Sequence, residues 1–436
     1  MLAADLVFAA KRERIQEEFR GAIDKFVAPK SVADELFLKW HVNSYRNIDD
    51  CEDSDFRNFL RAVAPKYEPM SRERVRNGVL MKAAKVLTDV NTVVNDQYIA
   101  ITTDTWTSVS NVTFSSLTAH FIDSNWKHVD LPIGCFNFPG KHTASDCDRQ
   151  FRHILSKCGI KEDHIVAVTT DNEATMNAWG DIMEWEWIGC IDHLINLITK
   201  IAFDDESIRS TMLKARQMVT FFSHSSQANE QLDRMQHTLD PRCVPLKVIN
   251  DVSTRLWSTY ALVERLIALK PAIQALVVTK TVGEYLNELD WQLVAELSNV
   301  LKPFKDFQLL MEGQKYVTLS FVPLVVSKLR KSLSQLLEDE NTSDRIRGLV
   351  VRMICKFEEK FGSGVEGTLF DEHKTRGPRN ARKGIPRKAF VCSALDPRTK
   401  SLPSLGMNDK MRVWDAVHAD LCNNIKKDKN EHKEGI

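Results

Sequence analysis

Apolar residues recur along this chain in patterns that change from one region to the next. Up to about residue 95 they lie three and four positions apart, as from Leu6 to Phe26, and Ser71 after Pro69 is placed to begin another helix. From 97 to 138 the pattern changes to short β-rich runs separated by turn signals, at Tyr98 to Thr103, Thr113 to Ile122 and Val129 to Phe138. These runs predict three consecutive strands in an antiparallel meander.

The following segments extend this into an α/β pattern. A helix is expected from about 144 to 158, then a strand from Ile165 to Thr170, and another helix from near Ile191. Three strands, a helix, a strand and a helix, in that order, form the ribonuclease-H-like arrangement, in which the first and fourth strands lie side by side. We therefore predict an α/β fold with a ribonuclease-H-like mixed sheet core.

Beyond about residue 203 the pattern is almost entirely helical. Helices are expected at 205–239, 256–278, 285–312, 318–338 and 342–361. We predict a helical N-terminal region at 1–95, a ribonuclease-H-like core at 96–204 and an all-α insertion domain at 205–400. A C-terminal helix with a disordered tail from Asn423 is expected at 401–436.

Composition and charge narrow the classes of function. Lysine plus arginine and aspartate plus glutamate are both 59, so attraction to nucleic acid or to an anionic membrane must be local. None of the nine cysteines forms a Cys-x-x-Cys pair and no signal-peptide pattern is seen, which favours a reducing, intracellular compartment. The longest apolar runs are too short to span a bilayer. No membrane association and no small-molecule cofactor are predicted.

Two aspartates stand where predicted strands end. Asp104 lies in Thr102-Thr103-Asp104-Thr105 and Asp171 in Thr169-Thr170-Asp171-Asn172, each at the end of an apolar, β-branched run. Two close carboxylates repel each other unless a cation such as Mg²⁺ or Mn²⁺ neutralises them, which is the requirement of metal-dependent phosphoryl chemistry. The alternative is that each aspartate caps a following turn or helix.

Several segments, taken in order, resemble the hAT superfamily of DNA transposases and the BED-finger proteins domesticated from them. They are Thr-Thr-Asp-Thr-Trp-Thr-Ser at 102–108, Leu-Thr-Ala-His-Phe-Ile-Asp at 117–123, Thr-Thr-Asp-Asn at 169–172, Cys-Ile-Asp-His-Leu-Ile-Asn-Leu at 190–197, Asp-Val-Ser-Thr-Arg-Leu-Trp-Ser-Thr-Tyr at 251–260, Tyr-Val-Thr-Leu-Ser at 316–320 and Ala-Leu-Asp-Pro-Arg at 394–398. The resemblance covers roughly residues 50 to 400. It implies a ribonuclease-H-like fold with a large α insertion and a D-D-E triad whose metal cuts and joins DNA, with Asp104 and Asp171 as its first two members.

The sequence also departs from that family. The third carboxylate, a glutamate, is expected in a C-terminal Ser-Glu-Arg-type motif that also serves dimerisation, and we find no such motif; Glu358, Glu359 and Asp396 stand in other contexts. No Cys-x-x-Cys with paired histidines precedes the helical lead-in, so neither a BED finger nor a zinc site is predicted. Two aspartates are expected to hold Mg²⁺ or Mn²⁺ weakly and not to support strand transfer.

Further candidates concern DNA contact. Cys190 and His193 share a helix face and could supply half of a zinc site. The alternative is that the cysteine is buried and the histidine is hydrogen-bonded. The resemblance implies a third role, in which His193 stands beside the metal and contacts a phosphate or orients a carboxylate. Trp257 suits either stacking on an unpaired base or packing, and Arg255 suits a phosphate contact or an ion pair. We interpret Trp179, Trp185 and Trp187 as packing residues.

A basic segment interrupts the helical domain. No acid occurs from His373 to Leu395, and seven cations fall within fifteen residues interleaved with glycine and proline, namely Lys374, Arg376, Arg379, Arg382, Lys383, Arg387 and Lys388. This segment favours nuclear import or non-specific phosphate contact; a solvated loop is the alternative.

Three functions remain open at this stage. We favour a nuclear, DNA-associated, transposase-derived protein without strand-transfer activity, forming a homo-oligomer or pairing with a partner chain through exposed apolar surface. The alternatives are an active, Mg²⁺-dependent hAT transposase whose glutamate lies elsewhere, and a helical protein-interaction scaffold.

Overall fold

The computed structural model describes most of the chain, as two compact units. The described residues are 30–95, 97–252, 256–279, 283, 285–313, 315–364 and 384–434. One unit comprises Met1–Asp96 with Ser156–Ile160, and the other Gln97–Leu155 with Lys161–Ile436. The helix expected over Leu6 to Phe26 lies outside the described residues.

The first unit is helical, as expected for this region. It consists of α2 (Lys30–Asn43), the short 3-10 helix η1 (Ile48–Glu52), α3 (Ser54–Val63) and α4 (Arg72–Val94). The Ser71 hydroxyl caps α4 by accepting a hydrogen bond from the Arg74 amide at 3.4 Å, which confirms the predicted start. A small core of Phe37, Leu38, Cys51, Met70 and Val75 holds these helices together.

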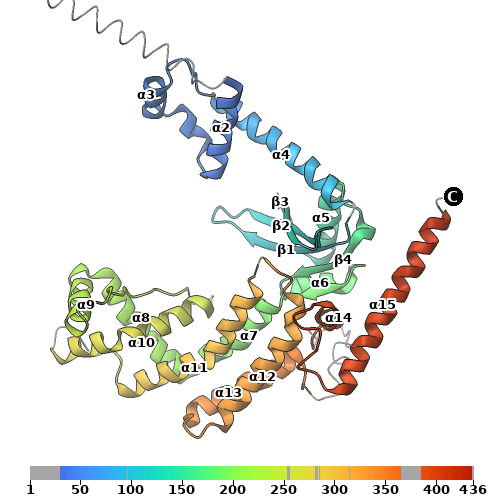
Figure 1. Cartoon of the computed structure of the whole chain (residues 1–436). Coiled ribbons are helices and arrows are strands. Elements are labelled where there is room, and N and C mark those ends of the chain that lie inside the picture. The colour runs from blue at the N-terminus through green and yellow to red at the C-terminus, as the bar shows by residue number, and fades with distance from the viewer. Residues whose placement is uncertain are drawn as a thin grey trace, which may run out of the picture. The chain divides into compact units, whose positions relative to one another are not determined.

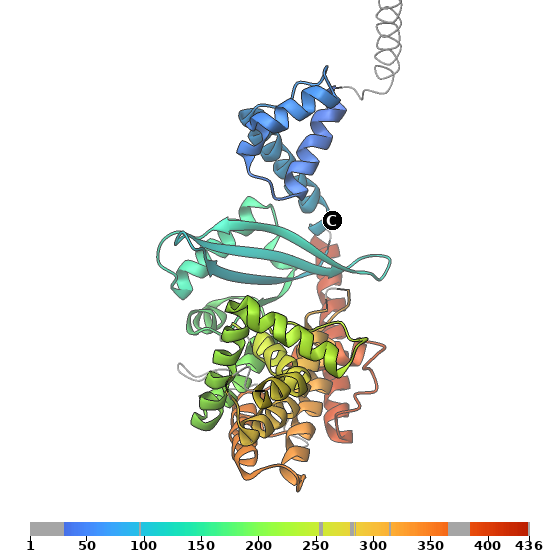
Figure 2. The ribbon, with the colours of Figure 1, turned by 90° about the vertical axis from the view of Figure 1, so that its left-hand side faces the viewer.

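The second unit contains a five-stranded sheet. Its strands are β1 (Ile99–Thr107), β2 (Thr113–Ile122), β3 (His128–Asn137), β4 (Ile165–Thr170) and β5 (Trp187–Gly189), in the spatial order β3-β2-β1-β4-β5 (Figure 1, Figure 2). The first three strands are antiparallel, whereas β4 runs parallel to both β1 and β5. The predicted ribonuclease-H-like order, with the first and fourth strands adjacent, is confirmed.

Alternation along β1 explains how the sheet presents polar groups. Ile99 and Ile101 are fully buried on one face, whereas Thr102 and Asp104 project from the other. Helix α5 (Ala144–Lys157), the 3-10 turn η2 (Glu162–His164) and α6 (Ala174–Ile182) connect the later strands. The apolar pattern predicts neither α6 nor β5, because both are short.

The three tryptophans of this region do pack as predicted. Trp179 and Trp187 are buried, and each indole N–H donates a hydrogen bond, to Asp148 at 3.1 Å and to the Thr170 hydroxyl at 2.9 Å. The Trp185 indole donates to the Glu162 carbonyl at 3.0 Å and lies against Phe151 and the Arg152 guanidinium.

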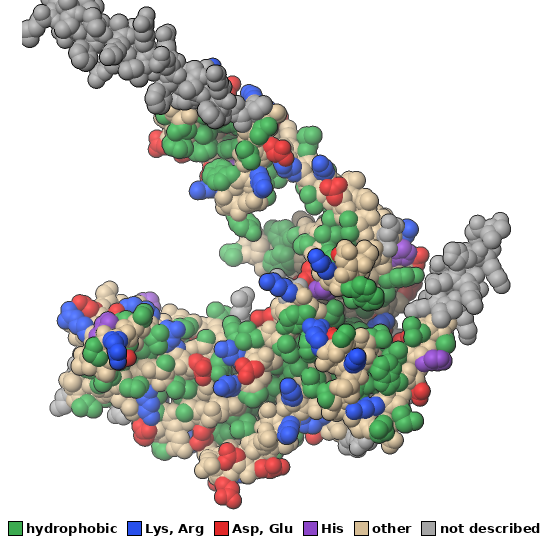
Figure 3. All heavy atoms as spheres, viewed as in Figure 1, with side chains coloured by type: hydrophobic (Ala, Val, Ile, Leu, Met, Phe, Trp, Pro, Cys, Tyr) green, Lys and Arg blue, Asp and Glu red, His purple; other side chains and the backbone are tan. Residues whose placement is uncertain are grey.

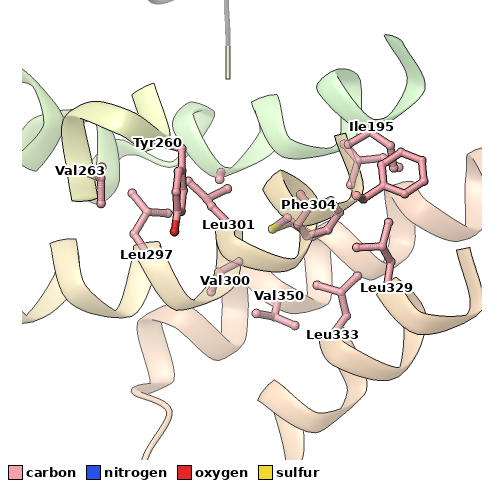
Figure 4. Close-up of a cluster of buried hydrophobic side chains, with 14 of the residues drawn as sticks. Ile195, Tyr260, Val263, Leu297, Val300, Leu301, Phe304, Leu329, Leu333 and Val350 are labelled. Carbon is pink, nitrogen blue, oxygen red and sulfur yellow. The ribbon is translucent and has the colours of Figure 1, made fainter. Parts of the chain in front are cut away.

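The remainder of the second unit is helical. It contains α7 (Ile191–Asp204), α8 (Glu206–His224), α9 (Ser226–Leu239), α10 (Leu256–Val278), α11 (Glu288–Met311), η3 (Leu319–Phe321), α12 (Val322–Glu338), α13 (Asp344–Phe361), α14 (Arg387–Leu395) and α15 (Met407–Glu434). In Figure 4, Leu301 and Phe304 of α11 lie among buried side chains of neighbouring helices. None of the described helices is long and apolar enough to cross a membrane.

Three helical expectations need correction. The helix expected over 205–239 is two helices, because the Ser225 hydroxyl accepts the Ala228 amide at 3.1 Å and starts α9 anew. The basic loop expected to run to residue 388 ends before Arg387, where α14 begins after Pro386. The tail expected to be disordered from Asn423 continues α15 to Glu434.

Candidate metal and nucleic-acid site

Asp104 and Asp171 lie on neighbouring parallel strands. Asp104 is inside β1, which continues to Thr107 and does not end at Thr103 as expected, whereas Asp171 directly follows the last residue of β4. The register pairs Ile101 with Val168 and Thr102 with Thr169, and both strands run on from there in the same direction towards their aspartates. Carboxyl ends of neighbouring parallel strands meet at one edge of a sheet, and the even spacing from Thr102 to Asp104 and from Thr169 to Asp171 places both carboxylates on the same face.

The electrostatics of Asp104 reflect this proximity. Its pKa is raised, chiefly because its carboxyl is partly withdrawn from water even though the residue is exposed overall, and also because the Asp171 charge repels its own. The Thr105 amide opposes the shift by donating a hydrogen bond to the Asp104 carboxylate at 3.0 Å. A divalent cation between the two carboxylates would remove this repulsion, so the pair fits Mg²⁺ or Mn²⁺.

The turn after Asp171 leads into α6, and its Asn172 side chain also contacts the residue that precedes α7. Asp171 accepts the Glu173 amide at 3.1 Å, and the Asn172 side chain donates to the Cys190 carbonyl at 2.6 Å. A Cβ at Gly189 would lie 2.1 Å from the Asn172 Oδ1, so only glycine allows this close approach. A cavity of about 40 Å³ adjoins Asn172 and Gly189, which is room for a water molecule and not for a base.

Helix α7 brings the Cys190, Asp192 and His193 segment to this edge of the sheet. Burial raises the pKa of the Cys190 thiol, which agrees with the packing alternative. His193 is half-buried in the first turn of α7. Asp192, which the sequence analysis quotes within a motif but does not single out, has a pKa raised to about 6, first by burial and then by the Glu312 charge.

Comparison with known proteins identifies the two parts of this unit. Residues 102–185 match the family model described as the ZBED1 RNase-like domain, and residues 188–300 match the ZBED1 RNase-like helical domain. The chain is a transposase-related protein of the hAT/BED type. The order of motifs in the sequence implies the same relationship. The matched domains confirm the predicted ribonuclease-H-like fold with a helical insertion.

Individual relatives of this hAT/BED-type chain are distant. The Putative AC transposase of Zea mays is 26% identical over 333 residues, covering 70% of this chain and 39% of that protein. Zinc finger BED domain-containing protein 4 of Homo sapiens is 26% identical over 238 residues, covering 54% of this chain and 18% of that protein. The chain thus spans less than half the length of these relatives. The solved Drosophila P element transposase strand transfer complex aligns with 86% of this chain and 96% of that chain at 10% identity and a TM-score of 0.30, too low to carry any argument.

Trp257, another predicted DNA contact of the hAT/BED-type chain, packs within the helical domain. Trp257 lies in α10, where the Lys305 ammonium of α11 sits 4.8 Å from its ring centroid. This contact with α11 favours packing over base stacking. Arg255 lies outside the described residues.

The basic segment divides into two parts. Lys374, Arg376, Arg379, Arg382 and Lys383 lie outside the described residues, whereas Arg387 and Lys388 begin α14. Arg387 pairs with Asp420 at 3.4 Å and Lys388 with Glu186 at 2.9 Å, so these two cations are neutralised. On the face drawn in Figure 3, the described Lys and Arg side chains are scattered among acidic and apolar ones.

A second polar cluster on the sheet is missed by the sequence analysis. His120 of β2 and His128 and Asp130 of β3 bring their ligand atoms within 4.8 Å of one another. The available signal was His-x-Asp within a strand, which places both side chains on one face, but the third member depends on the pairing register of β2 with β3.

Proposed function

We propose that this chain is the ribonuclease-H-like core of a nuclear, DNA-associated protein that binds Mg²⁺ or Mn²⁺ weakly through Asp104 and Asp171. The observation that carries the proposal is the placement of these carboxylates, side by side on parallel β1 and β4 within a segment that matches an RNase-like domain. A metal bound there would offer its open coordination positions to phosphate oxygens.

The electrostatic cost of the pair supports metal binding. At a separation of a few ångströms two like charges repel by roughly 1 to 4 kcal/mol at high to intermediate dielectric, and the raised pKa of Asp104 reflects part of that repulsion. A bound cation turns this repulsion into attraction. Asn at either position would remove one charge and with it most of the reason for a cation to bind.

Strand transfer is a separate matter. A two-metal mechanism requires ions about 3.5 to 4 Å apart, and two aspartates supply too few oxygens to hold both. We therefore propose that these residues alone do not cut or join DNA. An active transposase whose third carboxylate lies elsewhere is the second candidate, and it is supported by the similarity to the Putative AC transposase.

Calorimetric titration with Mn²⁺ tests the metal site. Asp104→Asn and Asp171→Asn should each weaken binding, whereas Asp163→Asn should leave it unchanged because that exposed carboxylate lies before β4, at the opposite end of the strand from Asp171. Unchanged binding in both site variants would refute the proposal.

A nicking assay with Mn²⁺ on supercoiled plasmid DNA separates the two candidates. We expect salt-sensitive binding, falling steeply between low and physiological salt, and no nicking. Nicking that Asp104→Asn abolishes and Asp163→Asn preserves would establish the active transposase. DNA binding absent even at low salt would instead favour a protein-interaction scaffold.

A further inference from the structure

Two histidines and an aspartate converge on the edge of the sheet formed by β2 and β3. The His120 Nδ1 lies 2.6 Å from the Asp130 Oδ1, and the His128 Nε2 lies 3.4 Å from the same oxygen. The two imidazole rings are nearly parallel, with centroids 6.1 Å apart. Within the part of the chain that the structure describes, these are the residues that bring three potential ligands together.

The backbone fixes this arrangement. His128 and Asp130 are two residues apart on β3 and share a face, while His120 is the direct cross-strand partner of Asp130. Directly opposed residues in antiparallel strands have Cβ atoms about 4.5 to 5.5 Å apart. All three ligands therefore project from rigid, paired strands, and little conformational entropy is lost when they bind a common ion.

The distances are close to those of a tetrahedral transition-metal site. Zn–N and Zn–O bonds of about 2.0 to 2.2 Å separate neighbouring tetrahedral ligand atoms by about 3.3 to 3.6 Å. The contact between His128 and Asp130 already has this length at 3.4 Å. The contact between His120 and Asp130 is a hydrogen bond, and it must open by roughly 0.8 Å for an ion to enter.

The surroundings of the cluster resemble those of bound metal ions in two respects. The Thr102 hydroxyl lies 2.8 Å from the His120 Nε2, which leaves the Nδ1 of that ring as the ligand and fixes the orientation of the ring. The side chains of His120, His128 and Asp130 remain 25%, 17% and 29% exposed, so an ion and a fourth, water ligand can reach them.

This cluster is distinct from the aspartate pair. His120 pairs with Ala100, four residues before Asp104 on β1, which corresponds to roughly 13 Å along the strand. Its donors differ as well, because imidazole suits Zn²⁺, Cu²⁺ and Ni²⁺ whereas all-carboxylate sites suit Mg²⁺ and Mn²⁺.

We propose that His120, His128 and Asp130 form a transition-metal site of the zinc type, which cross-links β2 to β3 and keeps one coordination position open. The rival explanation is a hydrogen-bonded cluster in which two imidazoles share one carboxylate and no ion enters. The two explanations make opposite predictions about whether the metal-free protein binds added Zn²⁺ at this cluster.

A titration with Zn²⁺ decides between them. The chain is first stripped of metal with a chelator, and then calorimetry measures Zn²⁺ binding and thermal unfolding measures the change in stability. The wild-type chain should bind one Zn²⁺ at this site and unfold at a higher temperature when loaded. His128→Gln and Asp130→Asn should each weaken binding at least about 100-fold and abolish the thermal shift, and Thr102→Val should weaken it about 10-fold. Circular dichroism of each variant verifies that the fold is intact.

Two controls assign the ion to this cluster. His153→Gln removes an exposed histidine of α5, and Asp104→Asn alters the other candidate metal site; both should bind Zn²⁺ as the wild type does. Replacement of Zn²⁺ by Co²⁺ should give a visible spectrum of nitrogen and oxygen ligation.

Several outcomes would overturn the proposal. They are absence of Zn²⁺ binding by the wild type, equal binding by His128→Gln and Asp130→Asn, and thiolate-to-cobalt charge-transfer bands, which would place the ion at a cysteine. If a ligand variant fails to fold, the Thr102→Val variant decides: it retains every ligand, and unchanged affinity there contradicts the proposed orientation of His120.

Discussion

Asp192 is a partly buried carboxyl whose ionisation should destabilise the folded protein at neutral pH. It lies in the first turn of α7, its Oδ1 is buried without a hydrogen-bond partner among the described residues, and Asn196 reaches its other oxygen at 3.5 Å. Burial and the Glu312 charge raise its pKa to about 6, and His193 opposes this only in part. The helix N-terminus, which favours a carboxylate by about 0.3 to 1 kcal/mol, is outweighed.

The sign and size of the effect follow from proton linkage. As pH rises from about 4 to about 6 the unfolded chain loses its Asp192 proton first, so the unfolded state binds fewer protons and the free energy of unfolding falls. The rise in the pKa of Asp192 from 3.8 to about 6 corresponds to at most about 3 kcal/mol, because solvent screens this partly exposed carboxyl, and that stability is lost above pH 7. Below pH 4 both states are protonated and the penalty is absent.

Asp192→Asn should therefore stabilise the protein, and only at neutral and higher pH. After subtraction of the lost interaction with the helix N-terminus, we expect a gain of about 2 kcal/mol at pH 8 that shrinks to near zero at pH 4. Urea denaturation at pH 4, 6 and 8 measures it. Glu312→Gln should give a smaller gain, because it removes the repulsion but leaves the desolvation.

Asp204→Asn, at an exposed position on the same helix, is the matched control and should change stability by less than about 0.5 kcal/mol at every pH. A gain for Asp192→Asn of equal size at pH 4 and pH 8, or no gain at pH 8, would refute the reasoning.

Two further predictions follow from ion pairs. Asp396 accepts a hydrogen bond from Ser320 at 2.6 Å and pairs with Arg398, whose guanidinium holds the pKa of Asp396 well below its usual range. A lowered pKa contributes stability above about pH 4, and this stability is lost as pH falls. Asp396→Asn should therefore reduce the free energy of unfolding by about 1.5 to 3 kcal/mol at pH 7 and by less at pH 3. A loss, measured by urea denaturation, that is equally large at pH 3 would contradict this. For location, glutamine at Lys374, Arg376, Arg379, Arg382 and Lys383 should leave a fluorescent fusion in the cytoplasm, whereas glutamine at the paired Arg387 and Lys388 should not; a five-residue variant that stays nuclear would argue against the import signal.

Local sequence signals predict the sheet well because each depends on neighbours along the chain. The bounds of β2 follow from its β-rich run and the flanking turn residues, and those of β4 follow from its apolar, β-branched run. The adjacency of Asp104 and Asp171 needs one fact more, the side-by-side position of the first and fourth strands, which the order of elements supplies. Trp257 and Lys388 show the limit, since their partners Lys305 and Glu186 lie far away in sequence and only tertiary packing brings them into contact.

The cluster of His120, His128 and Asp130 depends on a single turn. The loop 123–127 joins β2 to β3, and within it Asp123 accepts the Asn125 and Lys127 amides at 2.9 and 2.8 Å while Trp126 adopts a φ of 60°. This geometry pairs Ile122 with His128 and hence His120 with Asp130. A slip of one residue would pair His120 with Val129 or Leu131 and turn Asp130 to the opposite face. The cluster is therefore a consequence of register, and alternation within either strand is the same for both registers.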